Sequence, residues 1–259
     1  MKYNYHTHTA RCFHAKGSDE EYVKAAIEAG FDEIGFSDHS PWNFKGFVSN
    51  MRMHENELGE YCRSVKALRE KYKEQISIKL GLECEYFPKY MPWLKQMIEK
   101  HEIDYIILGH HFADDEIGGR YNGELSRKKE LYKYRDDILE ALDTGLFSYV
   151  AHPDLFMRGY PVFDECCEEI SRQIIKKAID TKTPLEFNLL GFTHSRNDGK
   201  QGYPHPDFWK IVGEMKPLVT VGIDAHYPEA YLDKELFESG YEALRQLGLE
   251  AEKSIEMLR

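Results

Sequence analysis

Histidine and carboxylate residues occur in closely spaced groups along this chain. One residue separates His6 from His8, one residue separates Asp224 from His226, and two histidines are adjacent at 110–111. Residues two apart in an extended strand project to the same side, so each spaced pair can direct two ligands toward one centre. Imidazole and carboxylate groups bind zinc, iron and manganese, and they also carry protons. The spacing therefore favours a metal site.

The composition narrows the kinds of protein that fit. The 259 residues include 12 histidines, and 34 Lys and Arg against 45 Asp and Glu give a formal charge of −11. This negative charge argues against binding of extended nucleic acid, which requires a positively charged surface. No apolar run approaches a membrane span, and the N-terminus shows no signal-peptide core, so we expect a cytoplasmic protein with no membrane partner.

The five cysteines do not suggest a disulfide framework or a thiolate zinc site. Their number is odd, and they form no Cys-x-x-Cys pair. Both features argue against these two roles. Any metal must then be held by imidazoles and carboxylates.

Short β-rich segments alternate with longer helical patterns through the whole sequence. This alternation is typical of β-α units around a parallel sheet or barrel, and no linker interrupts it, so one domain over 1–259 is the simplest account. Strands are predicted over 2–6, 33–37, 77–85, 105–109, 147–151, 185–188 and 218–224. Helices are predicted over 18–30, 54–75, 91–101, 125–144, 164–181, 207–215 and 234–247.

Local signals define some boundaries more sharply than others. Ser18 followed by Glu21 matches a helix capping box. The most loop-like stretches are 40–50, 113–123 and 191–205.

The metal-binding residue types gather just beyond the C-terminal ends of the predicted strands. In α/β barrels catalytic residues converge at this rim. Seven or more imidazoles at one rim would repel one another when protonated. They would also leave buried polar groups without hydrogen-bond partners unless metal cations bound them. His54, His101 and His205 lie on predicted helices or helix starts and are interpreted as solvated or hydrogen-bonded residues. The rim group is His6, His8, His39, Glu83, His110, His111, His152, Asp224 and His226, with His14 in a loop nearby.

The ordered motifs resemble those of the polymerase-and-histidinol-phosphatase (PHP) superfamily, within it the histidinol-phosphatase branch. They run from residue 6 to residue 226 and so cover nearly the whole chain. The motifs are His6-Thr7-His8-Thr9, Cys12-Phe13-His14-Ala15-Lys16-Gly17-Ser18, Phe36-Ser37-Asp38-His39-Ser40-Pro41, Gly81-Leu82-Glu83, Gly109-His110-His111-Phe112, Ala151-His152-Pro153-Asp154 and Ile223-Asp224-Ala225-His226.

The resemblance implies a distorted seven-stranded β/α barrel holding three divalent ions, zinc above all, with iron or manganese as alternatives. The family ligand usually precedes a Phe or similar residue, and strand alternation points His110 elsewhere, so His111 is preferred to His110. The implied ligand sets are His6, His8, Glu83 and Asp224 for one ion, Glu83, His111 and His152 for a second, and His14, His39 and His226 for a third.

Such a centre suits hydrolysis of a phosphate ester by a metal-bound hydroxide, because clustered cations bind a phosphate dianion and lower the pKa of water. Asp224, His226 and Glu83 are the expected catalytic residues, and Asp224 could also accept a proton from the water. Arg158 and Arg196, in loops that open onto the rim, are expected to grip the phosphate, in agreement with the family pattern. Candidates for the layer behind the ligands are Asp38, His110, Asp154 and His194.

Three functions remain open at this point. The leading one is hydrolysis of L-histidinol phosphate to L-histidinol and phosphate in histidine biosynthesis, with a small phosphorylated metabolite as the partner. The second is a PHP-type phosphoesterase acting on nucleotides or short oligonucleotides. The third is a metal-binding barrel without activity, which the complete ligand set disfavours. The oligomeric state is not predicted.

Overall fold

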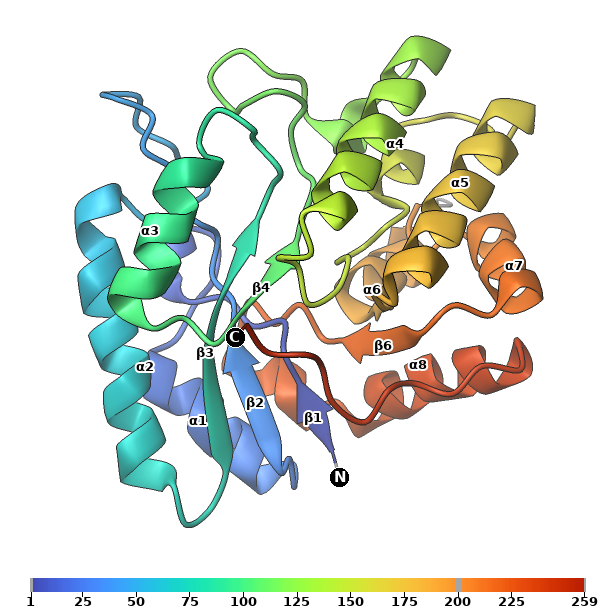
Figure 1. Cartoon of the computed structure of the whole chain (residues 1–259). Helices are drawn as coiled ribbons and strands as arrows, with labels where there is room; N and C mark the ends of the chain where they lie inside the picture. The colour runs from blue at the N-terminus through green and yellow to red at the C-terminus, as the bar shows by residue number, and fades with distance from the viewer. Residues whose placement is uncertain (1, 199–201, 259) are drawn as a thin grey trace.

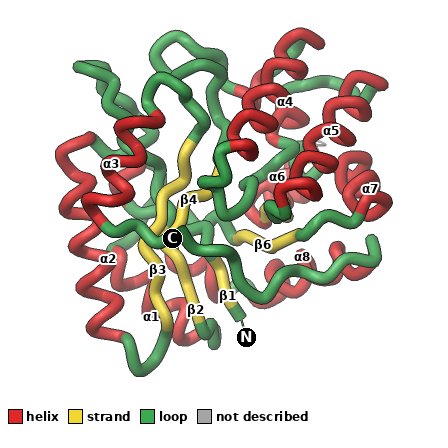
Figure 2. The backbone as a smooth tube through the Cα atoms, in the orientation of Figure 1, coloured by secondary structure: helices red, strands yellow, loops and turns green. Residues whose placement is uncertain are grey.

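Parallel strands form the inside of the molecule and helices form its outside. The computed structural model describes residues 2–198 and 202–258, and Figures 1 and 2 show the strands surrounded by helices. The strands are β1 (Tyr3–Asn4), β2 (Glu33–Phe36), β3 (Ser77–Cys84), β4 (Tyr105–Leu108), β5 (Leu185–Asn188) and β6 (Val219–Gly222). Helices cover the strands from outside, with α2 against β3 and α8 against β5, as expected of β-α units.

The strands form two parallel sheets, one of four strands in the order β1-β2-β3-β4 and one pairing β5 with β6. In the first sheet Tyr3 pairs with Glu33, and in the second Leu185 pairs with Val219. A single parallel bridge joins Thr7 to Ala225, just beyond the ends of β1 and β6. The prediction of α/β architecture with a parallel sheet is thus confirmed.

The strand predicted over 147–151 is reduced to one bridged residue. Val150 forms parallel bridges to Leu108 on one side and Leu185 on the other. The next turn of the chain explains the short pairing, because His152 has φ of 32°, a left-handed conformation that cannot continue a strand. The predicted segment therefore lies between β4 and β5, but not as a regular strand.

Seven of the eight α-helices in the described part of the chain match the predicted helices closely. They are α1 (Asp19–Glu28), α2 (Leu58–Tyr72), α3 (Met91–His101), α4 (Lys128–Asp143), α5 (Glu165–Thr181), α7 (Pro206–Met215) and α8 (Lys234–Gln246). The predicted capping box is present at α1, where Glu21 N donates to Ser18 Oγ and Ser18 N donates to the Glu21 carboxylate. None of the described helices combines the length and apolar character needed to cross a membrane.

One prediction of loop structure is wrong. The stretch 191–205 was expected to be a loop, but its first part belongs to α6 (Leu189–Asp198). The helix follows β5 directly, and Asn188 Oδ1 accepts a hydrogen bond from Gly191 N at its first turn. Asn is a favoured residue at a helix start, so Asn188 is a local signal that the prediction of a loop overlooked.

The C-terminal segment crosses the end of the strands opposite the histidines. Ala251 bridges Val219 at the start of β6, and Leu258 N donates to Asp104 O just before β4. Figure 1 shows this segment running across the front of the molecule past the strands. The C-terminal segment thus covers one end of the strands, and the histidines gather at the opposite end.

Candidate metal centre

Glu83, near the C-terminal end of β3, lies at the centre of the histidine cluster. Its side chain is buried and occupies the space beside Gly109, where an added Cβ would lie 2.0 Å from Glu83 Oε1. Five imidazole nitrogens surround its two oxygens. These are His39 Nδ1 and His152 Nε2 at 2.9 Å, and His6 Nε2, His8 Nε2 and His111 Nε2 at 3.5 Å.

Asp224 forms a second carboxylate focus beside Glu83. Its Oδ1 lies 3.1 Å from His8 Nε2 and 3.4 Å from His6 Nε2. Asp224 has φ of 54°, and the left-handed conformation of His152 was noted above. Non-glycine residues in this region carry strain of about 1–3 kcal/mol, which clusters at functional sites. Strand β6 ends at Gly222, so a backbone turn, rather than the strand alternation we expected, aims Asp224 into the centre.

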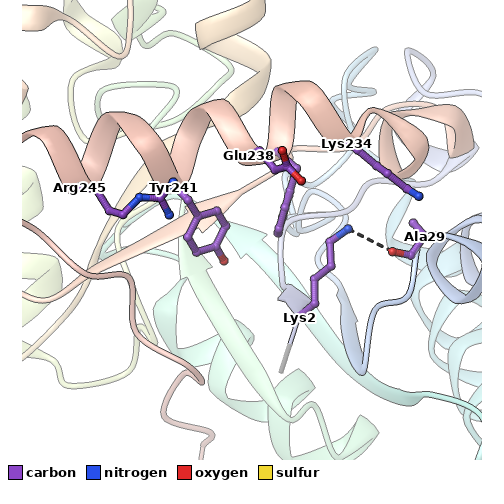
Figure 3. A pocket seen from close by; sticks show the side chains of 7 residues that line it. Lys2, Ala29, Lys234, Glu238, Tyr241 and Arg245 are labelled. Carbon is purple, nitrogen blue, oxygen red and sulfur yellow. Dashed lines mark hydrogen bonds between the residues drawn. The ribbon is translucent and has the colours of Figure 1, made fainter.

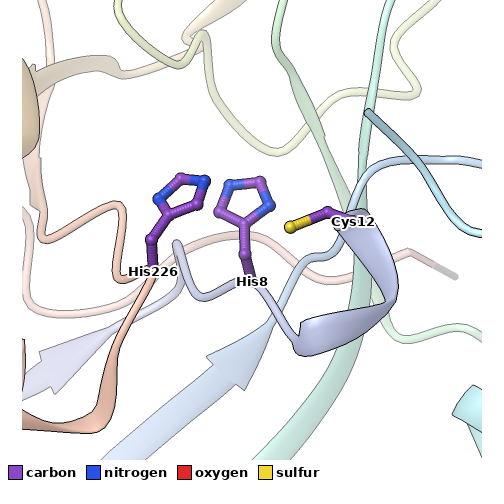
Figure 4. A group of neighbouring side chains, drawn as sticks. All are labelled: His8, Cys12 and His226. Atoms are coloured by element: carbon purple, nitrogen blue, oxygen red, sulfur yellow. The ribbon is translucent and has the colours of Figure 1, made fainter. Parts of the chain in front are cut away.

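A third group of imidazoles lies at the outer side of the cluster. Ligand atoms of His14, His39 and His226 lie within 4.8 Å of one another. The ring of His8 stacks on that of His226 with centroids 4.2 Å apart, and Figure 4 shows this pair with the sulfur of Cys12 beside His8. Together the three groups bring all nine predicted ligands to one place.

Several imidazoles are held from behind through Nδ1. Where a carboxylate or carbonyl accepts from Nδ1–H, the lone pair of Nε2 is left facing the centre, as metal-ligating histidines require. The partners are Glu186 Oε1 for His6 at 2.8 Å, Glu85 Oε1 for His111 at 3.3 Å, Cys12 O for His14 at 2.6 Å and Asp224 O for His226 at 3.0 Å.

The centre contains buried polar atoms that the described protein groups do not satisfy. His6 Nε2, Glu83 Oε2 and Asp224 Oδ1 are buried and lie close to other ligand atoms, but none of them has hydrogen-bond geometry with a described residue. Buried polar atoms of native proteins are nearly always paired, and imidazole and carboxylate donors are the ligands of zinc, iron and manganese. The residues present therefore fit divalent cations.

The charges of the cluster support the same interpretation. Burial raises the pKa of Glu83, but the imidazoles of His111, His39 and His6 outweigh it and hold the pKa well below its ordinary value. For His226 burial acts in the other direction and lowers the pKa to about 3, and the ring of His8 lowers it further. Burial lowers the pKa of His6 and His8, but Asp224 and the other facing carboxylates outweigh it and raise both pKa values well above the ordinary value. Without cations these imidazoles carry the positive charge that balances the ionised carboxylates, and bound divalent ions would take that role while the ligating imidazoles become neutral.

Two residues behind the ligands were not predicted from the sequence. Glu186 in β5 accepts from His6 and also from His152 N, and Asn188 Nδ2 donates to Asp224 Oδ2 at 3.1 Å. The signal was two polar residues at alternate positions of a fully buried strand, Leu185–Asn188. A buried carboxylate in such a strand needs a partner, and this one orients a ligand.

The four residues predicted for the layer behind the ligands have different surroundings. Asp38 Oδ1 lies 3.5 Å from His8 Nδ1, and exposed His194 lines the cavity over the centre. His110 points away and places Nε2 3.2 Å from Asp137 Oδ2. Asp154 accepts a hydrogen bond from the backbone N–H of His205, the residue at the start of α7.

The two predicted arginines are placed differently. Arg158 ends the short 3₁₀ helix Leu155–Arg158 and lines the cavity, with Nη1 donating to the phenol oxygen of Tyr121 at 2.8 Å. Arg196 belongs to α6 and not to a loop, and its side chain lies outside the described residues. Arg158 is thus the described arginine at the centre.

The cavity over the centre is small and polar. It measures about 180 Å³, and its lining includes Glu83, Asp224 and Tyr203 with most of the clustered histidines. A larger cavity of about 600 Å³ lies elsewhere, between Lys2 and α8, and Figure 3 shows it lined by Lys2, Lys234 and Arg245 with one carboxylate, Glu238, and no histidine. The chemistry identifies the smaller cavity as the site.

The fold and the cluster define a β/α protein whose clustered His, Glu and Asp side chains, at the C-terminal ends of its strands, are able to bind metal. The model of the PHP domain matches residues 4–189, and the chain belongs to this family. The resemblance stated from the motifs is confirmed.

Named relatives and a solved structure resemble most of the chain. A probable histidinol-phosphatase of Deinococcus radiodurans is 27% identical over 235 residues, which cover 86% of this chain and 85% of that protein. A histidinol-phosphatase of Lactococcus lactis is 25% identical over 87% of this chain and 84% of that protein. The crystal structure of a Lactococcus lactis histidinol phosphate phosphatase, complexed with zinc, L-histidinol and phosphate, superposes with a TM-score of 0.76 at 22% identity, covering 100% of this chain and 99% of that one.

Proposed function

We propose that this chain is a metal-dependent phosphomonoesterase that hydrolyses L-histidinol phosphate to L-histidinol and phosphate. The observation that carries the proposal is a buried carboxylate, Glu83, shared by five imidazoles beside Asp224. The names of the relatives, together with the zinc, L-histidinol and phosphate of the similar solved structure, support the choice of substrate.

The residues present would hold three divalent ions, zinc first among the candidates. Glu83 would be a ligand in two of the three sets. The sets would be His6, His8, Glu83 and Asp224, then Glu83, His111 and His152, and finally His14, His39 and His226. When bound, the ions would supply an electropositive pocket for phosphate and a nucleophile from water near neutral pH.

The side chains around the cavity have separate tasks in this proposal. Arg158 contributes a guanidinium that grips the phosphate, because planar N–H groups match phosphate oxygens. Asp224, facing His6 and His8, accepts a proton from the attacking water. Asn188 fixes the Asp224 carboxylate through its amide N–H and so holds the accepting oxygen in place.

We also infer that the seven strand-like segments act as one distorted barrel in a single domain. Bridges at Val150 lie between β4 and β5, and the Thr7–Ala225 bridge lies between the ends of β1 and β6. These pairings support a closed ring of strands. At the C-terminal ends of the strands the pairing is interrupted by the turns that carry the ligands. The distortion would follow from turns that aim His152 and Asp224 inward.

A phosphate-release assay with zinc-loaded protein tests the proposal. L-histidinol phosphate, nucleoside monophosphates and a short oligonucleotide are compared as substrates, and zinc per chain is measured in parallel. We expect the first to turn over fastest. Good hydrolysis of another substrate without hydrolysis of L-histidinol phosphate would refute the substrate assignment while leaving the chemistry intact.

Variants of the cluster test the site itself. Asp224→Asn and His39→Ala should lose activity, and His39→Ala should also lose bound zinc. His54→Ala is the matched control, because His54 is an exposed histidine outside the cluster. Activity like that of the parent protein in both cluster variants would contradict the proposed site, and retained zinc without hydrolysis of any phosphoester would favour a metal-binding protein without activity.

A further inference from the structure

Arg52 is a fully buried arginine that joins three separate parts of the chain. Its side chain is 1% exposed, in the stretch between β2 and α2. Nη1 donates to Ser40 O at 3.0 Å, Nη2 donates to Glu85 Oε1 at 2.7 Å, and Nε donates to Glu116 Oε2 at 2.6 Å. A buried guanidinium between two carboxylates is costly unless its donors are satisfied, and here every nitrogen has an acceptor.

Glu85 is the carboxylate through which Arg52 reaches the metal centre. Glu85 lies just beyond β3, two residues after Glu83, and is buried. Its Oε2 accepts from Trp42 Nε1 at 2.7 Å and from Arg52 Nη1 at 3.1 Å. Its Oε1 accepts from Arg52 Nη2 and faces His111 Nδ1 at 3.3 Å. The carboxylate is therefore fixed from several directions and can move little.

The position of Glu85 determines what His111 can do. Because a fixed carboxylate accepts from Nδ1–H, the imidazole keeps its lone pair on Nε2, which lies 3.5 Å from Glu83 Oε1. Carboxylates that hold a ligating histidine in this way typically contribute 10–100-fold to metal affinity or activity. His111 stands at the end of β4 and has no other described hydrogen-bond partner for its ring among residues 2–198 and 202–258.

The third contact of Arg52 extends this arrangement to the loops above the centre. Glu116 lies in the stretch between β4 and α4, and its Oε1 accepts from Ser49 Oγ at 2.6 Å. Arg52 and Ser49 belong to one loop and Glu116 to another, so the guanidinium and the hydroxyl together hold the two loops side by side. One buried arginine thereby contacts both loops and the carboxylate behind a ligand.

We propose that Arg52 and Glu85 form a positioning pair that fixes His111 for metal binding and ties the two loops to that ligand. The inference rests on the proposed metal centre and adds to it two residues that do not touch the ions or the substrate. The inference gives the buried charge of Arg52 a role in retaining the metal. Stability of the fold alone does not require this charge, because proteins with apolar residues in place of a buried ion pair are often as stable.

Zinc retention in Glu85→Gln and Arg52→Lys tests the pair. Zinc-loaded proteins are mixed with a colorimetric chelator, and the rate and number of ions released are followed. Glu85→Gln should release at least one ion about 10–100-fold faster than the parent protein. Arg52→Lys keeps the charge but loses the planar fork, so its release should be faster by about tenfold. In Co²⁺-loaded protein both variants should change the visible absorption spectrum, because the ligand geometry changes.

Arg69→Lys is the matched control for loss of a structural arginine. Arg69 donates to Ile78 O in β3 and pairs with Asp104 just before β4, so it spans the same two strands at the end away from the ligands. Its release rates and Co²⁺ spectrum should equal those of the parent protein. Equal acceleration in Arg69→Lys and Arg52→Lys would overturn the inference, because the effect would then reflect general destabilisation.

Two further outcomes separate this inference from the proposed function. Folded Glu85→Gln and Arg52→Lys that release zinc within twofold of the parent rate would refute the positioning pair and leave the phosphatase proposal standing. A parent protein that retains no divalent ion after loading would refute the metal centre, and the inference with it. Thermal unfolding of each variant establishes that the compared proteins are folded.

Discussion

Arg158 offers a direct test of phosphate binding at this site. Its guanidinium lies over the ring of Tyr121, and Nη1 donates to the phenol oxygen at 2.8 Å. No acceptor for Nη2 or Nε is found among the described residues, so this edge can make a two-bond contact with phosphate. The change to examine is Arg158→Ala, with Arg158→Lys and Tyr121→Phe as partial perturbations.

The magnitude follows from the two hydrogen bonds that would be lost. A hydrogen bond to a charged group contributes about 1.5–3 kcal/mol, and the lower value applies because Arg158 is exposed. Two such bonds give about 3 kcal/mol, or roughly a hundredfold decrease in kcat/KM. Arg158→Lys should retain the charge and one bond and lose about tenfold. Tyr121→Phe removes the acceptor that positions Nη1, and a smaller loss of a few fold is expected.

Steady-state kinetics with L-histidinol phosphate measure the decrease, and competitive inhibition by inorganic phosphate provides an independent measure of the same contact. The inhibition constant for phosphate should rise in parallel with the fall in kcat/KM, while zinc per chain stays unchanged. A decrease below threefold in Arg158→Ala would refute the reasoning. A decrease accompanied by loss of zinc would refute it as well, because the arginine would then act through the metal centre.

Three further predictions concern the ligands, a helix start and pH dependence. Glu83→Gln should lose at least one zinc ion per chain and more than about a hundredfold of activity, as measured by metal analysis and phosphate release, because the amide cannot replace a shared carboxylate; unchanged zinc content would contradict this. Ser18→Ala should lower the free energy of unfolding by about 1 kcal/mol in urea titrations, because the capping box with Glu21 is lost; an unchanged free energy would show that the cap contributes nothing. Burial lowers the pKa of His205, whose Nδ1 accepts from Asp207 N, so its contribution to stability is present above the ordinary pKa of about 6.5 and is lost as pH falls below it. Urea unfolding at pH 8 and pH 5.5 should therefore show His205→Asn gaining stability relative to the parent protein at the lower pH, and a constant difference would refute this.

Much of the fold could be predicted because its signals are local. The capping box of α1 lies within four residues, and the bounds of α3 were predicted to the residue because its apolar face and ends are both visible in the sequence. The alternation of strands and helices also indicated where the ligands would gather, since parallel strands end at the same rim. His205 capping α7 agrees with the simpler interpretation of that histidine as a hydrogen-bonded residue.

Other features depend on which chain segments become neighbours. Glu186 is 180 residues from His6, and nothing in the local pattern of β5 indicates which imidazole its carboxylate faces. Arg52 resembles any loop arginine until β3 brings Glu85 beside it. The regular strand expected over 147–151 is reduced to one bridged residue because the backbone turns at His152, and the loop expected over 191–205 begins as α6 because Asn188 caps the first turn of that helix.

The sequence by itself determined the repeated β-α order, the residue types of the centre and their place at the strand ends. These depend on periodicity and on spacing along one segment, which a single chain displays directly. The sequence already favoured His111 over His110 as the ligand, but only the tertiary structure decided which groups hold the two rings, Glu85 behind His111 and Asp137 beside His110. The reason is physical, because the role of an imidazole depends on which group accepts from its other nitrogen, and packing alone brings that group into place.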